Sequence, residues 1–130
     1  MKTPQETFDT VARALAAQGR PSVSAETCLC RYRGDNGTKC AVGHLIPDEL
    51  YRPELEGNVA STLCIREITE ALGHNRVLVR ELQHAHDNAY DDSSPDGWLK
   101  LWAGAMRNIA EDWGLSMEAL EAALAARGTA

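Results

Sequence analysis

Hydrophobic residues recur at intervals of three and four along most of the chain, which is the spacing of an amphipathic helix. The first predicted helix begins at Thr3, because a capping threonine, Pro4 and Glu6 together form a typical helix N-terminus. It ends at Gly19. Its inward stripe contains Phe8, Val11, Ala12 and Leu15.

Further helices are predicted after residue 60, each preceded by a residue that can cap it. The predicted caps are Ser61, Asn75, Ser94 and Ser116, and glycines at 73 and 114 end two of these helices. The inward positions are Leu63, Cys64, Ile65, Ile68 and Leu72, then Leu78, Val79, Leu82, Ala85, His86 and Ala89, then Leu99, Trp102, Met106, Ile109 and Trp113, and finally Met117, Leu120 and Leu124. The pattern predicts a mainly α-helical single domain over residues 1–130, as a compact bundle of about five helices.

The segment between the first and second of these helices has a different pattern. Residues 28–33 can be extended, and Asn36-Gly37 is a strong turn signal, so a small β-hairpin or ordered loop is predicted near residues 28–42. Residues 38–42 are then either the returning strand or the approach to a short helix. We favour a short helix at about Cys40 to Ile46, ended by Pro47, followed by an irregular surface segment to Asn58.

Composition and charge exclude several classes of protein. Hydrophobic residues make up 44% of the chain and charged residues 25%, which is typical of a globular protein. The net charge is −6, and residues 44–130 hold fifteen acidic against seven basic residues, so general nucleic-acid binding is not expected. No stretch approaches the roughly 18 to 20 apolar residues of a membrane span, and the N-terminus lacks a signal core. The expected location is the cytoplasm, away from membranes.

Two blocks of the sequence resemble motifs in small, uncharacterised proteins of bacteriophages and prophages. The first block combines Cys30-x-Tyr32-Arg33, Gly37-x-Lys39-Cys40-Ala41-Val42-Gly43, Leu45-Ile46-Pro47-Asp48 and Tyr51, and the second is Leu82-Gln83-x-x-His86-Asp87. The resemblance covers about half of the chain. It implies a phage-type accessory origin and marks these residues, but it implies no mechanism.

Zinc binding is the first chemical interpretation of the first block. Cys30, Cys40 and His44, with Cys28 nearby, form a sulfur-rich set, and one helical turn separates Cys40 from His44. The one-residue spacing between Cys28 and Cys30 is unusual for zinc, whose cysteine pairs are normally two residues apart. The alternative is a set of reduced, buried cysteines without any cofactor.

A cysteine nucleophile is the second interpretation. Cys40 at the start of a helix, next to Lys39, would have a lowered thiol pKa. His86 would act as the base and Asp87 as an accompanying acid, although neighbouring helical positions diverge by about 100°, which places Asp87 poorly for orienting His86. His44 is an alternative base. The competing structural interpretation is a histidine at the edge of the core and a surface acid.

A ligand-binding surface is the third interpretation. Arg31 and Arg33, with Tyr32 between them and Lys39 beyond the turn, could hold a small anion such as a phosphate. An ion pair between Arg33 and an acid such as Asp48 explains the same residues structurally. Trp98 lies beside the inward stripe of its helix, so it is expected to be the most exposed tryptophan and a partner contact.

These alternatives lead to three expected functions. The first is a non-enzymatic binding module that occupies a host protein or a small anionic ligand, with countering of a host defence as one purpose. The second is a cysteine-dependent hydrolase or transferase that uses Cys40 and His86. The third is a zinc-stabilised structural domain.

Overall fold

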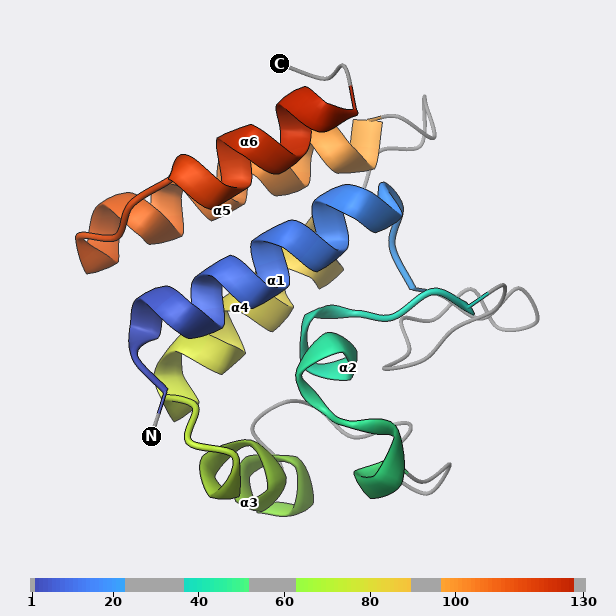
Figure 1. Cartoon of the computed structure of the whole chain (residues 1–130), viewed down its shortest axis with the longest axis vertical. Coiled ribbons are helices and arrows are strands. Elements are labelled where there is room, and N and C mark those ends of the chain that lie inside the picture. Colours follow the sequence, from blue (N-terminus) through green and yellow to red (C-terminus); the bar gives the residue numbers. More distant parts are fainter. Residues whose placement is uncertain (1, 23–36, 52–62, 90–96, 128–130) are drawn as a thin grey trace.

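The computed structural model describes residues 2–22, 37–51, 63–89 and 97–127 (Figure 1). In these ranges the chain is mainly helical. The elements, in chain order, are α1 (Pro4–Gln18), α2 (Ala41–Leu45), a 3₁₀ turn η2 (Asp48–Leu50), α3 (Leu63–Ala71), α4 (Arg76–Asn88), α5 (Gly97–Trp113) and α6 (Glu118–Ala126). The prediction of a mainly helical bundle is therefore confirmed, with α2 as a short addition to five longer helices.

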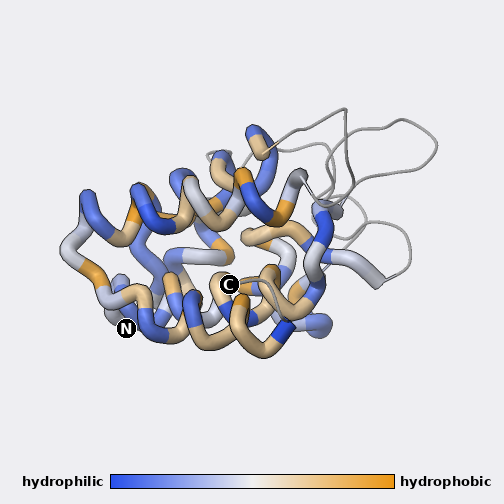
Figure 2. Tube along the Cα trace, turned by 90° about the horizontal axis from the view of Figure 1, so that it is seen from above, coloured by the Kyte–Doolittle hydropathy of each residue, from blue (hydrophilic) through white to orange (hydrophobic). Residues whose placement is uncertain are grey.

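The bundle is built around α1. This helix packs against α4, α5 and α6, while α2 is wedged against α1 and α4. Figure 1 shows α1 and α6 in front, with α4 and α5 behind them. Hydrophobic and hydrophilic positions alternate along each helix (Figure 2), and the hydrophobic ones meet in one continuous core. Its largest fully buried side chains include Phe8, Leu15, Leu78, Leu82, Trp102, Met106, Leu120 and Leu124.

The helix ends follow the local chemistry of the sequence. The Thr3 hydroxyl accepts a hydrogen bond from the Glu6 amide, and the Glu6 carboxylate accepts one from the Thr3 amide, which completes a capping box. Gly19 ends α1 with a φ of 75°, in the left-handed region that favours glycine. The Asn75 side chain caps α4 through the amides of Val77 and Leu78. These three predicted boundaries are confirmed.

The starts of α2 and α6 test two further predictions from the sequence. Residues 41 and 42 lie in α2, so the returning-strand alternative for residues 38–42 is wrong and the favoured short helix is confirmed. The predicted cap Ser116 bonds the Glu118 amide, but α6 begins only at Glu118, with Met117 in the capping position. The predicted hairpin residues 28–36, and the predicted caps Ser61 and Ser94, lie outside the described residues.

The described helices include none that is long and apolar enough to span a membrane.

Candidate functional site

The approach to α2 is held to the bundle by two glutamine side chains. Gln18, at the end of α1, forms a paired contact with the Lys39 backbone: its Oε1 accepts the amide proton and its Nε2 donates to the carbonyl, each at 2.8 Å. Gln83, on α4, accepts the Val42 amide proton at 2.9 Å. The first amides of a helix have no partner within that helix, so Gln83 supplies an acceptor that α2 lacks. The start of α2 is thereby fixed between α1 and α4.

Cys40 lies in the capping position of α2, where the sequence predicted the start of a helix. Its side chain is fully buried, and Sγ accepts the Gly43 amide proton at 3.4 Å. Burial raises the pKa of the Cys40 thiol to about 12, and the charge of Asp87 acts in the same direction. The expectation of a lowered thiol pKa is therefore wrong. The helix has only five residues, and its favourable N–H groups do not offset the loss of water around the sulfur.

His86 and Asp87 form a directly bonded pair. Asp87 Oδ1 lies 2.8 Å from His86 Nδ1 and also accepts a hydrogen bond from Gln83 Nε2 at 2.9 Å. Side chains of a helix lean toward its N-terminus, so the Asp87 carboxylate reaches back to both partners. The expectation that Asp87 is poorly placed to orient His86 is therefore wrong.

The second nitrogen of the His86 ring faces the chain that follows α1. The Ser22 amide donates to Nε2 at 2.9 Å, and a nitrogen that accepts this bond carries no proton. Nε2 is thus the acceptor of the ring, and Nδ1 is the nitrogen that can donate to Asp87. The His86 side chain has no exposed surface, whereas that of Asp87 is 35% exposed. Nε2 joins Ser22 to α4, while Nδ1 is bonded to Asp87 within α4.

Trp98, on α5, contacts both the backbone and the ring of His86. Its indole N–H donates to the His86 carbonyl at 3.0 Å, its ring meets the His86 ring edge-on, and it stacks on Trp102. Only 5% of Trp98 is exposed. The expectation that Trp98 is the most exposed tryptophan is therefore wrong, because α5 packs against α4 and covers a position that helical periodicity alone placed at the edge of the core.

The remaining predicted site residues are His44 and Lys39, which both contact Gln18, and several that lie outside the described ranges. His44 Nε2 is bonded to Gln18 Oε1 at 3.1 Å, and burial, with the nearby charge of Lys39, lowers the pKa of His44 to about 4. The Lys39 ammonium nitrogen Nζ lies 3.9 Å from Asp48 Oδ1. Within the described residues, no three His, Cys, Asp or Glu side chains are arranged to hold a metal ion. The predicted ligands that lie outside those residues are Cys28, Cys30, Arg31, Tyr32 and Arg33.

The described part of the site therefore joins the two sequence blocks. Cys40 and Val42 of the first block meet Gln83 of the second, and the charge of Asp87 acts on Cys40. Three contributors, Gln18, Gln83 and Ser22, carried no predicted role. A polar residue at an inward helical position was the available signal for Gln83, which is only 5% exposed and lies one residue after Leu82 on α4.

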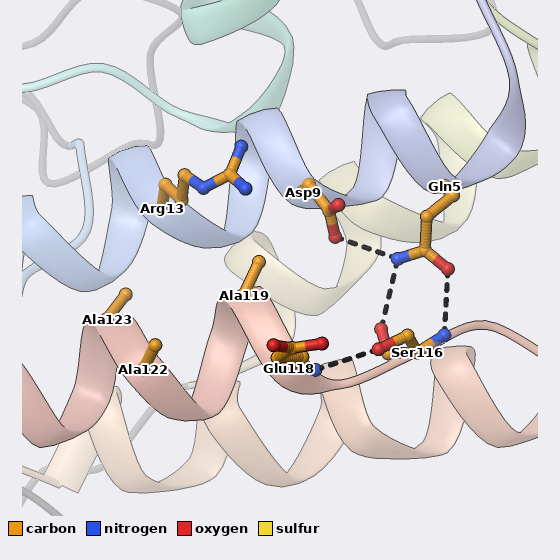
Figure 3. A pocket seen from close by; sticks show the side chains of 8 residues that line it. All are labelled: Gln5, Asp9, Arg13, Ser116, Glu118, Ala119, Ala122 and Ala123. Carbon is orange, nitrogen blue, oxygen red and sulfur yellow. Dashed lines mark hydrogen bonds between the residues drawn. The ribbon is translucent and has the colours of Figure 1, made fainter.

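An open groove of about 680 Å³ lies on another side of the bundle, between α1 and α6 (Figure 3). The Gln5 amide closes one end by pairing with the Ser116 backbone, at 2.7 Å and 3.0 Å, and also donates to Asp9. Arg13 lines the groove from α1, and three alanines line it from α6: Ala119, Ala122 and Ala123. The polar groups at the closed end are used in joining the two helices.

The chain matches no protein-family model, no curated protein and no solved structure.

Proposed function

We propose that this protein is a non-enzymatic binding module, a phage- or prophage-type accessory protein of the cytoplasm that acts by occupying a host protein, for example to blunt a host defence. The observation that carries the proposal is that the side chains of the predicted catalytic set form hydrogen bonds within the fold. Cys40, His86 and Asp87 are engaged by neighbouring groups of the same chain, and two of the three are buried.

The cysteine-dependent alternative needs a thiolate and a base that meets it. A thiol with a pKa of about 12 is almost entirely protonated near neutral pH. His86 would have to give up the Ser22 amide before its Nε2 could accept a proton. Ionising Cys40 opposes its burial, and freeing His86 Nε2 breaks the hydrogen bond from Ser22. This arrangement favours a structural role for Cys40, His86 and Asp87, and we therefore place the function on the surface of the protein.

A small anion as the occupant has less support than a protein. Lys39 is the described member of the predicted basic cluster, and its ammonium group pairs with Asp48. In contrast, Leu50, Val77 and Leu101 are large apolar side chains with 38%, 41% and 47% of their surface exposed. These side chains lie on three different elements, and each leaves apolar surface that a protein partner could cover.

The test combines native mass spectrometry with a chemically inert variant. Tagged protein is purified without chelator from a bacterial host and weighed intact, alongside Cys40→Ala protein whose fold is verified by circular dichroism. A binding module predicts one host protein in fixed stoichiometry with both forms. A bare polypeptide mass in every host strain, or loss of the biological effect in folded Cys40→Ala protein alone, would contradict the proposal.

A further inference from the structure

A second groove, of about 400 Å³, follows the contact between α4 and α5. Its floor is apolar and built from small or largely buried side chains, chiefly Ala85, Ala89, Ala105 and Ile109. Leu101 stands at its edge and is 47% exposed, the largest exposed fraction among the large apolar side chains described. Small floor residues beside one projecting leucine leave room for the larger side chains of a partner.

The shape of this groove suits a helix. Its α4 wall extends from Glu81 to Ala89, which at the rise of an α-helix is about 12 Å, or two helical turns. α5 supplies the second wall through Leu101 and Asn108. An amphipathic helix lying along such a wall places side chains at intervals of three and four residues onto the apolar floor.

The charge at the groove favours a basic partner. Among its lining residues Glu81 is acidic and none is lysine or arginine, while Asn88 and Asn108 add amide groups. Asp112, one turn after Asn108, continues the groove face of α5, whereas the Asp87 carboxylate is bonded to Gln83 and His86 on another side of α4. Glu81 and Asp112 are therefore the carboxylates that the groove offers to a partner.

We infer that the α4–α5 groove is a docking site for a basic amphipathic helix of a partner protein. Aliphatic or aromatic side chains of that helix cover Leu101 and the alanine floor, and its lysines or arginines lie against Glu81 and Asp112. This inference rests on the proposed binding function, and it adds the surface and the chemistry of the partner.

The test selects ligands from a displayed library of short amphipathic helices, with Leu, Ile or Phe at the apolar positions and Lys, Glu or Gln beside them. Leu101→Asp is the main variant, since an exposed side chain can be changed without unfolding the bundle. Leu50→Asp is the matched control, because Leu50 is an exposed leucine on η2 that does not line the groove. Asn108→Lys and Asn108→Asp test the charge.

The expected result is enrichment of basic helices. Leu101→Asp weakens their binding at least tenfold, Asn108→Lys weakens it severalfold, Asn108→Asp does not weaken it, and Leu50→Asp has no effect. Enrichment of acidic helices, no enrichment, or binding insensitive to Leu101→Asp would overturn the inference. A wild-type dimer that Leu101→Asp dissociates would also overturn it, because a second copy would then fill the groove. A host protein that binds the Leu101→Asp variant normally would refute this site while leaving the binding function intact.

Discussion

The clearest test of the network that holds α2 is the replacement of Gln83 by leucine. Gln83 is 5% exposed, its Oε1 accepts the Val42 amide proton, and its Nε2 donates to Asp87. Leucine has a similar volume, so the change removes both hydrogen bonds without opening a large cavity. The Val42 amide is left buried without an acceptor.

The expected loss of unfolding free energy follows from the polar groups of Val42 and Asp87 that Gln83→Leu leaves without their partner. An unpaired buried N–H costs about 1–3 kcal/mol. Asp87 keeps its bond to His86 and is 35% exposed, so water compensates most of its loss. The expected loss is about 2 kcal/mol of unfolding free energy. With a urea m-value of about 1.5 kcal/mol/M, the midpoint should fall by about 1.3 M. The melting temperature should fall by about 7 °C for a chain of this length.

The assay is urea unfolding monitored by circular dichroism, combined with amide hydrogen exchange. Exchange should accelerate most at the Val42 amide, which loses its acceptor on Gln83. Arg80→Leu is the control, because Arg80 is an exposed polar residue of the same helix and its replacement should change stability by less than about 0.5 kcal/mol. The reasoning is refuted if Gln83→Leu costs no more than Arg80→Leu, or if the amides of α2 remain equally protected.

Three further predictions concern single side chains. With the other cysteines replaced by serine, Cys40 should react with iodoacetamide at pH 8 at least about a hundredfold more slowly than an exposed thiol, and equal rates would contradict its burial. His44 has a folded-state pKa of about 4, below the 6.5 of the unfolded chain, so the unfolded state binds the proton first and stability should decrease as the pH falls from 6.5 toward 4. The loss is on the order of 1 kcal/mol after solvent screening, and His44→Gln should flatten that pH dependence in urea titrations. Thr3→Ala removes the α1 cap and should lower stability by about 1 kcal/mol, whereas Thr10→Ala, at an exposed position within α1, should be neutral in thermal unfolding.

Local signals in the sequence predicted the helical framework well because they depend on near neighbours. A capping box at Thr3, a left-handed glycine at 19 and a capping asparagine at 75 each act within one turn of the chain. The apolar stripe of α4 likewise identified Leu78, Leu82 and His86 as inward, and all three are buried. Periodicity of this kind needs no knowledge of what lies opposite.

The candidate site was less predictable because its properties come from residues distant in the sequence. The sequence located Cys40 at a helix start correctly, but the sign of its pKa shift depends on how completely α1 and α4 exclude water from the thiol. Trp98 shows the same limit, since its burial requires α5 to cross α4 at the level of His86.

The sequence alone therefore predicted the helices of the described residues and the inward faces of α1 and α4, through periods, caps and breakers that act over a few residues. Only the tertiary structure decided what the polar side chains inside the bundle do. Gln18 reaches Lys39 across 21 positions, and the Ser22 amide reaches His86 across 64. The physical reason is that hydrogen bonding and desolvation depend on the distance between atoms in space, which a linear pattern does not record.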